Sequence, residues 1–154
     1  MLHVFDFDGT LTADHLSGYE ISQVANMGET LIDRRLLGKL WSTLIHAGHK
    51  VAVASFGRRD IIELSLGHLR KLVTISTPKD FGYQDNTVAL GNKNRQLQRL
   101  TRLLGVSPAD TILYDDNASN IRAALGAGYK AVHCPRGLRP DIMVNLIQGA
   151  ARPQ

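Results

Sequence analysis

Short, uninterrupted apolar runs alternate along this chain with segments whose apolar residues repeat at helical spacing. The runs predict strands over residues 2–8, 51–55, 72–75, 111–114 and 130–133. The periodic segments predict helices over residues 30–47, 58–69, 93–104, 118–127 and 140–148. Continuous apolar strands are typical of parallel sheets that helices cover on both faces. We therefore expect an α/β fold, a three-layer, doubly wound (Rossmann-like) and mainly parallel sheet.

Composition and charge narrow the class of protein. No apolar run approaches a membrane span, and no basic segment followed by an apolar one opens the sequence. The single Cys134 rules out an internal disulfide framework and favours a reducing, cytoplasmic location. A net charge of +4 mildly favours anionic partners. No basic stripe interleaved with aromatic residues is visible, which disfavours nucleic acid as a partner without excluding it.

Chemically reactive side chains follow three of the expected strands. They are Asp6 and Asp8 after the first, Ser55 after the second, and Asp115 and Asp116 after a later one. The carboxyl ends of parallel strands share one edge, and ligands bind there. Buried like charges need a cation or a proton between them, and Mg²⁺ is a cation that binds both carboxylates and phosphates. We therefore expect a magnesium and phosphate site at this edge.

Two further features point to the same edge. Lys93, at the start of a helix, is placed to reach it, although Lys79 is a rival for that role. The backbone N–H groups of Phe56 and Gly57 precede another helix, and a helix N-terminus attracts phosphate oxygens. We expect these groups to bind the phosphate.

These residues, in this order, resemble the motifs of the haloacid dehalogenase (HAD) superfamily of aspartate-nucleophile phosphotransferases. Asp6-Phe7-Asp8-Gly9-Thr10 matches the first motif, Ser55 the second, Lys93 the third, and Asp115-Asp116 with Asn120 the fourth. The match spans nearly the whole chain. The retained Asp8 points, within the superfamily, to hydrolysis of phosphomonoesters.

The resemblance implies a role for each residue. Asp6 attacks phosphorus to give an aspartyl-phosphate, and Asp8 serves as general acid and then as general base. Ser55 and Lys93 hold the phosphoryl oxygens. Mg²⁺ is bound by the Asp6 carboxylate and the Asp8 backbone carbonyl. The fourth motif adds one acid to the metal site, with Asp116 preferred to Asp115. Asp115 and Asn120 then act from beside or behind the metal, and Thr10 also supports the site.

Spacing indicates a chain without a cap domain. The connections over residues 13–28 and 77–92 are each far shorter than the roughly 50 residues of an independent domain. We expect one domain over residues 1–154, similar to the small capless phosphatases of the superfamily. Their open sites admit phosphoproteins, nucleic-acid ends or sugar phosphates.

Several points stay open at this level. Arg58 and Arg59 face either the rest of the substrate or solvent, and His15 is expected at the surface. A phosphorylatable receiver-like switch and a non-catalytic phosphate-binding protein are the alternatives to a phosphatase. The oligomeric state is not predicted.

Overall fold

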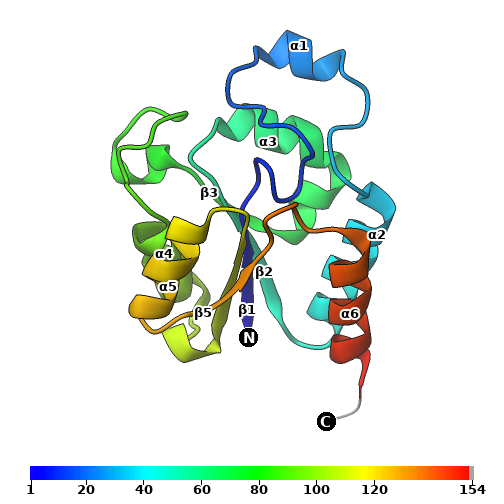
Figure 1. Ribbon diagram of the computed structural model, residues 1–154, viewed down its shortest axis with the longest axis vertical. Coiled ribbons are helices and arrows are strands. Elements are labelled where there is room, and N and C mark those ends of the chain that lie inside the picture. Colours follow the sequence, from blue (N-terminus) through cyan, green and yellow to red (C-terminus); the bar gives the residue numbers. More distant parts are fainter. Residues whose placement is uncertain (153–154) are drawn as a thin grey trace.

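The computed structural model describes residues 1–152, which form a five-stranded, all-parallel sheet (Figure 1). The strands are β1 (Leu2–Phe5), β2 (Lys50–Ala54), β3 (Thr74–Ser76), β4 (Thr111–Asp115) and β5 (Lys130–His133). Their order in the sheet is β3-β2-β1-β4-β5, so the chain reverses direction across the sheet between β1 and β4. Ligand sites of such sheets lie at the carboxyl ends of the strands beside this reversal. The predicted fold class is confirmed.

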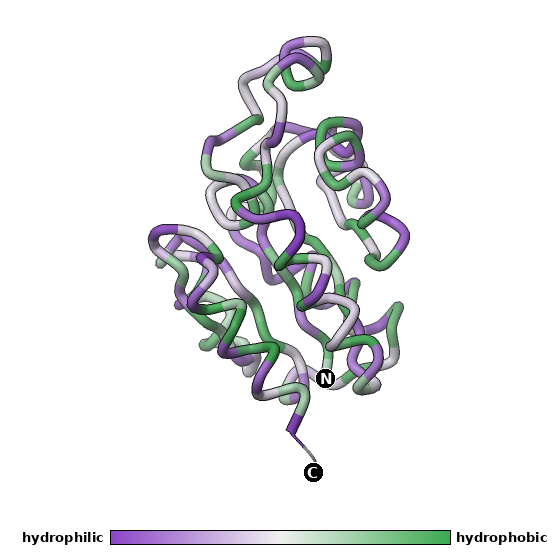
Figure 2. The backbone as a smooth tube through the Cα atoms, turned by 90° about the vertical axis from the view of Figure 1, so that its right-hand side faces the viewer, coloured by the Kyte–Doolittle hydropathy of each residue, from purple (hydrophilic) through white to green (hydrophobic). Residues whose placement is uncertain are grey.

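Helices cover both faces of the sheet (Figure 1). The α-helices are α1 (Ile21–Ala25), α2 (Arg34–His46), α3 (Arg59–Leu66), α4 (Asn94–Leu104), α5 (Ala118–Gly126) and α6 (Pro140–Ala151). Three 3₁₀ turns complete the described elements: η1 (Gly67–Leu72), η2 (Pro78–Phe81) and η3 (Pro108–Asp110). α4 and α5 pack on one face of the sheet, and α2, α3 and α6 pack on the other. Along the helices, hydrophobic and hydrophilic residues alternate in Figure 2, as expected where one side of a helix is buried.

The two faces of β1 belong to different cores because successive side chains of a strand point to opposite sides. Phe5 packs with Trp41 of α2, and its ring stacks on that of Tyr114 with centroids 4.6 Å apart. Leu2 and Val4 face α4 and α5 in the second core. β1 therefore lies between β2 and β4 in the sheet and between the two cores, and both its ends are buried.

The first strand ends earlier than residue 8. The Asp6 N–H still donates to the Tyr114 carbonyl at 2.9 Å, but the carbonyl of Phe7 accepts from Leu11 N–H, also at 2.9 Å. The chain thus turns at Phe7, which lifts Asp8 into the loop.

The helix expected from Thr30 begins at Arg34 instead. Asp33 is its N-cap, with its side chain accepting from Leu36 N–H at 3.0 Å. The residues before it are drawn away from helical geometry, since Ile32 N–H donates to the Leu11 carbonyl at 2.8 Å. This pairing, with the isolated bridge between Thr12 and Leu31, closes the base of the 13–30 connection.

Neither long connection forms a cap domain within the described residues. The first contains only the five-residue α1, which projects above α3 in Figures 1 and 2. The second contains only η2, and its residues 88–90 do not form a strand. Over residues 1–152, every helix is too short or too polar to cross a membrane.

Candidate active site

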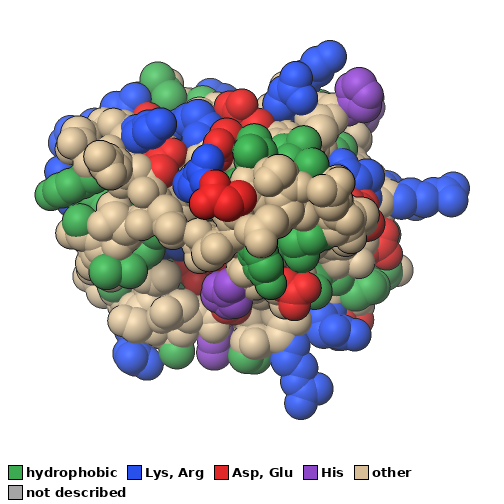
Figure 3. All heavy atoms as spheres, turned by 90° about the horizontal axis from the view of Figure 1, so that it is seen from above, with side chains coloured by type: hydrophobic (Ala, Val, Ile, Leu, Met, Phe, Trp, Pro, Cys, Tyr) green, Lys and Arg blue, Asp and Glu red, His purple; other side chains and the backbone are tan. Residues whose placement is uncertain are grey.

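A cavity of about 640 Å³ opens at the carboxyl ends of β1, β2 and β4. Figure 3 looks down on this end of the molecule and shows acidic and histidine side chains beside a recess. The structure brings six predicted residues into the lining: Asp6, Asp8, Ser55, Lys93, Asp115 and Asp116. Phe56, Gly57 and Asn120 line the cavity as well. Residues far apart in the sequence therefore meet because parallel strands end at one edge.

A buried ion-pair cluster forms the floor of the cavity. Lys93 Nζ lies 2.8 Å from Asp6 Oδ1 and 3.2 Å from Asp115 Oδ2. The three residues are almost inaccessible to solvent, at 2% for Lys93, 6% for Asp6 and 0% for Asp115. Lys79, the rival lysine, is exposed on η2. One cation thus compensates two carboxylates.

Burial and pairing act against each other in this cluster. Burial raises the pKa of Asp6 and of Asp115, and the charge of Lys93 only partly opposes this effect. Burial alone would lower the pKa of Lys93, but the two carboxylates outweigh it and raise that pKa. Lys93 is therefore held as a cation. The carboxylates retain a surplus of negative charge, which a metal ion or a proton would relieve.

The Thr10 hydroxyl links Asp116 to Asp6 by hydrogen bonds. The Thr10 hydroxyl lies 2.9 Å from Asp6 Oδ2 and 3.4 Å from Asp116 Oδ1, and it accepts from Asp116 N–H at 3.1 Å. One carboxylate oxygen each from Asp6, Asp115 and Asp116 fall within 4.8 Å of one another. An all-oxygen set of this kind suits Mg²⁺.

The two acids of the fourth motif differ in how they are engaged. Asp115 accepts from Asn117 N–H at 2.9 Å and from Asn120 Nδ2 at 3.1 Å, in addition to Lys93. Within residues 1–152, the one ion-pair partner of Asp116 Oδ2 is His15 Nε2, at 3.8 Å. Asp116 is therefore the acid whose oxygen is more available to a ligand.

Asp8 lines the same cavity as Asp6. Its Oδ1 accepts from Leu16 N–H at 2.7 Å, which fixes the side chain against the 13–30 connection. Burial raises the pKa of Asp8, while the Leu16 hydrogen bond acts in the opposite direction. A carboxyl group with a raised pKa is suited to carry a proton near neutral pH.

Ser55 and the turn after it face Asp8. Ser55 Oγ accepts from Gly57 N–H at 2.9 Å, so this N–H is already engaged within the turn. The Lys93 ammonium lies 4.7 Å from the centroid of the Phe56 ring. Gln96, buried on α4, donates to the Ser55 carbonyl at 2.8 Å and holds the turn in place.

Gly9 is required by the space around it. Its φ of +76° is left-handed, and a Cβ there would lie 2.6 Å from Asp116 Oδ2 and 2.8 Å from His15 Nε2. The loop is held from behind, because Leu138 N–H donates to the Thr10 carbonyl at 2.8 Å. A side chain at residue 9 would displace Asp116.

Arg58 and Arg59 are not brought into the cavity. Arg58 pairs with Asp60 at 2.6 Å, and Arg59 donates to the Ile75 carbonyl at 2.9 Å. His15 is exposed as expected, yet it also lines the cavity. Other lining residues that sequence reasoning missed are Ser17, Asn86, Thr87, Val88, Gly91, Asn117 and Ser119. All of them belong to loops or a helix start, where no periodic pattern shows which way a side chain points.

Comparison with known proteins gives a fold but no close relative. No protein-family model matches the chain, and no curated protein matches it. Among solved structures, the HAD domain of effector protein Lem4 from Legionella pneumophila (inactive mutant) is similar, with a TM-score of 0.68 and 12% identity. That match covers 97% of this chain and 92% of the other.

Two further structures are similar. CbbY from Rhodobacter sphaeroides, in complex with xylulose-(1,5)bisphosphate, has a TM-score of 0.65 and 18% identity over 91% of this chain and 88% of its own. DsGPDH of Dunaliella salina has a TM-score of 0.57 and 21% identity over 84% of this chain. This chain spans only 22% of the Dunaliella chain. At these identities the matches show the fold alone, and they confirm the one that the motifs indicated.

Proposed function

Because the chain has the haloacid dehalogenase fold, we propose that it is a magnesium-dependent phosphomonoester hydrolase, formed by a single capless domain. One observation carries the proposal. Asp6 is buried at the end of the central strand, 2.8 Å from the Lys93 ammonium, and Asp8 lines the same cavity two residues later. A nucleophile, its counter-ion and an acid thus share one site.

The proposed reaction has two steps. In the first, an Asp6 carboxylate oxygen bonds to phosphorus while the bond to the leaving oxygen breaks, and Asp8 gives that oxygen its proton. In the second, Asp8 takes a proton from water, whose oxygen attacks the phosphorus of the aspartyl-phosphate. Inorganic phosphate leaves and the Asp6 carboxylate is restored. The raised pKa of Asp8 supports its role as the initial proton donor.

The phosphoryl group would be held by Lys93, the Ser55 hydroxyl and the N–H of Phe56. Gly57 N–H would also hold the phosphoryl group only after its hydrogen bond to Ser55 Oγ had broken. Donors aimed at developing negative charge are usually the largest contribution to such catalysis, and removing one typically costs about 10²–10³ in rate.

The residues fit Mg²⁺. We assign its ligands to the carboxylates of Asp6 and Asp116 and the backbone carbonyl of Asp8. Asp115, engaged by Lys93 and Asn120, would support the site from behind. When bound, the ion neutralises phosphate charge that would otherwise repel the nucleophile. The surplus negative charge of the buried acids supports this assignment.

A receiver-like switch is disfavoured by the topology. Receivers have the strand order 2-1-3-4-5, whereas this sheet has β3-β2-β1-β4-β5. The complexes of CbbY with phosphate and with xylulose-(1,5)bisphosphate support a phosphomonoester as the substrate class.

Release of phosphate from an aryl phosphate tests the function. We expect Mg²⁺-dependent turnover that EDTA abolishes, and a loss of about 10³ or more on Asp6→Asn, because two steps depend on this group. Asp8→Asn should slow both steps. The matched control is Asp14→Asn, an exposed acid in the same loop. Undiminished release by Asp6→Asn would reject Asp6 as the nucleophile. No release from the wild type would reject catalysis and leave a phosphate-binding protein.

A further inference from the structure

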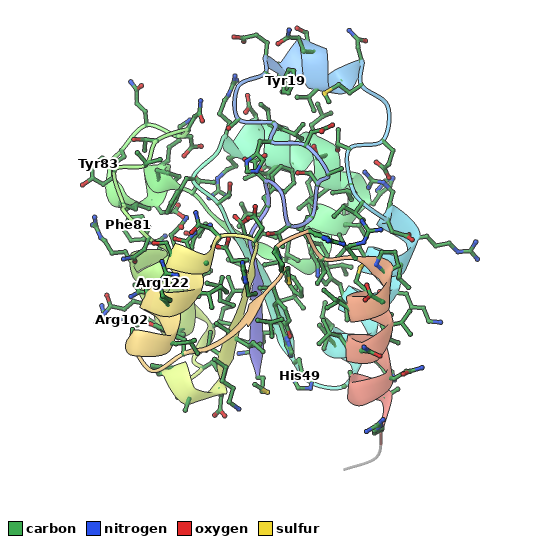
Figure 4. The ribbon with its side chains drawn as sticks, viewed as in Figure 1. Tyr19, His49, Phe81, Tyr83, Arg102 and Arg122 are labelled. Carbon is green, nitrogen blue, oxygen red and sulfur yellow. The ribbon has the colours of Figure 1, made fainter. Side chains whose placement is uncertain are left out.

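The exposed side of α4 carries three arginines that the phosphatase proposal does not use. Arg95, Arg99 and Arg102 are exposed and lie four and three residues apart, so they share one side of the helix. Figure 4 shows Arg102 on the same side of the molecule as Phe81, Tyr83 and Arg122. The helix therefore presents a stripe of positive charge.

Aromatic rings are interleaved with this stripe. The Arg95 guanidinium lies 4.9 Å from the centroid of Phe81 and 5.9 Å from that of Tyr83. Tyr83 is 40% exposed, which leaves ring surface for a ligand. The ring of Tyr129, which is only 8% exposed, borders a hollow of about 520 Å³ together with Arg95 and Arg102. We call Arg95, Arg99, Arg102, Phe81 and Tyr83 the arginine–aromatic surface.

The positive charge of this surface is largely uncompensated. Within residues 1–152, Arg95 and Arg102 take part in no ion pair. Arg99 approaches Asp80 only to 3.8 Å, and Arg59 also contacts that carboxylate, at 3.4 Å. The three arginines border a second hollow of about 460 Å³. The surface is thus ready for an anionic ligand.

The arginine–aromatic surface shares two chain segments with the candidate active site. Lys93, on the cavity floor, precedes Arg95 by two residues at the start of α4. The connection over residues 77–92 presents Phe81 and Tyr83 to the arginines, and its residues 86–88 to the cavity. The surface and the cavity are therefore joined by one connection and by the start of one helix.

We propose that the arginine–aromatic surface binds single-stranded nucleic acid and that a terminal phosphate of the strand reaches the cavity. The second part rests on the proposed phosphatase function. Arginines recognise the phosphates of the strand, and exposed rings stack on its bases. An acidic peptide would match the charge but would leave the rings without a partner. The sequence does not reveal the surface, since its arginines and rings lie in separate segments that only folding interleaves.

Binding is measured by fluorescence anisotropy with a labelled single-stranded oligothymidine of about 15 nucleotides, near the upper end of known site sizes. The oligonucleotide carries no terminal phosphate and EDTA is present, so binding does not depend on hydrolysis. We expect R95Q/R99Q/R102Q to weaken binding about tenfold or more. The slope of log Kobs against log[salt] should become shallower by about 2 in this variant. Each of the three arginines that no longer neutralises a phosphate removes ~0.7 from that slope.

The matched control is R35Q/K39Q/K71Q, which removes the same charge from exposed positions on α2 and η1. It should bind within about twofold of the wild type. Equal loss in the two triple variants would overturn the proposal, because net charge alone would then explain binding. If the arginine triple variant fails to fold, Tyr83→Ala replaces it. We expect this variant to bind about fivefold more weakly, because it loses one stacking ring. An unchanged affinity would reject stacking.

Competition identifies the class of ligand. Unlabelled oligothymidine should displace the probe at lower concentration than poly-glutamate of equal charge. Equal displacement by poly-glutamate would overturn the nucleic-acid assignment in favour of an acidic protein.

Turnover tests the second part separately. Phosphate release from a terminally phosphorylated oligonucleotide should exceed that from a mononucleotide in kcat/KM, and the ratio should fall in the arginine triple. A ratio that stays the same would reject the path from surface to cavity. Absence of turnover on every substrate would instead reject the phosphatase function, and the binding results would still decide the surface.

Discussion

The two ends of β1 bury polar groups in opposite ways. Asp6, at the carboxyl end, and His3, at the amino end, are each only 6% exposed. Asp6 is held against the Lys93 ammonium at 2.8 Å. His3 Nδ1 lies 2.8 Å from the Tyr114 hydroxyl, and burial followed by the charge of His49 lowers the pKa of His3 to about 4. One end is compensated by an opposite charge, and the other is neutral at physiological pH.

This difference distinguishes a buried polar group that only supports the fold from buried charges that are available for chemistry. A neutral imidazole on a phenol needs no counter-ion, and it holds no charge that a substrate can use. The carboxyl end keeps charged groups in a place of low dielectric, where, under the proposed function, their effect on a reacting phosphate would be large. The stability of the carboxyl end therefore depends on its charged partners, whereas that of the amino end depends mainly on pH.

The largest effect is expected from removing the counter-ion. Lys93→Met should lower the free energy of unfolding by about 3–5 kcal/mol, because Asp6 and Asp115 stay buried without a cation. Urea denaturation in EDTA measures it, with Lys39→Met, an exposed lysine on α2, as the control. Adding Asp6→Asn to Lys93→Met should recover part of the loss. A cost below about 1 kcal/mol would show that the pairing is not what holds this end together.

The amino end should respond to acid instead. The pKa of His3 falls from 6.5 to about 4 on folding, so between these values the unfolded chain binds more protons. Stability is therefore lost as pH falls through this window, by about 2 kcal/mol between pH 7 and pH 5 at ~1.4 kcal/mol per pKa unit.

Denaturation curves of the wild type and His3→Gln at the two pH values test this effect. The variant should lose about 2 kcal/mol less on acidification. The exposed His68→Gln should follow the wild type. Parallel losses in wild type and His3→Gln would mean that other groups govern the acid response.

The smallest change in stability is expected from alanine substitutions at two glycines, one in the site and one outside it. Comparing them distinguishes backbone strain from displacement of a site residue. Gly9 and Gly28 have the same φ of +76°, but a Cβ on Gly28 would meet nothing within 4 Å. Gly28→Ala should cost about 1–2 kcal/mol from the left-handed backbone alone and leave phosphate release unchanged. Gly9→Ala should cost at least as much and also reduce phosphate release, since Asp116 is displaced. Equal turnover in the two variants would show that Asp116 tolerates the shift.

Sequence reasoning succeeded where the pattern was long or the geometry was shared. Each expected strand is present. The three central strands, β1, β2 and β4, are the most buried, as continuous apolar runs predict, whereas the edge strands β3 and β5 are only partly covered. The strand-end argument brought together Asp6, Asp8, Ser55 and the two acids of the fourth motif, since parallel strands end at one edge. Lys93 joined them because the start of α4 lies at the same edge.

It failed where tertiary contacts decide the outcome. α1 was missed because Val24 is the one buried residue of its five, too few to give a period. The helix expected to continue to residue 69 changes to a 3₁₀ turn at Gly67, whose φ of +57° is left-handed. His15 and the two rings of the arginine–aromatic surface depend on loop paths that no local pattern encodes.

The hydrogen bond from Leu138 N–H to the Thr10 carbonyl has a consequence for how the chain is made. A ribosome delivers the loop that holds Asp8 and Gly9 long before it delivers the residue that holds the loop in place. β1 likewise waits for β4, which comes late. A chain released before residue 138 should therefore lack the bond that fixes the loop carrying Asp8 and Gly9.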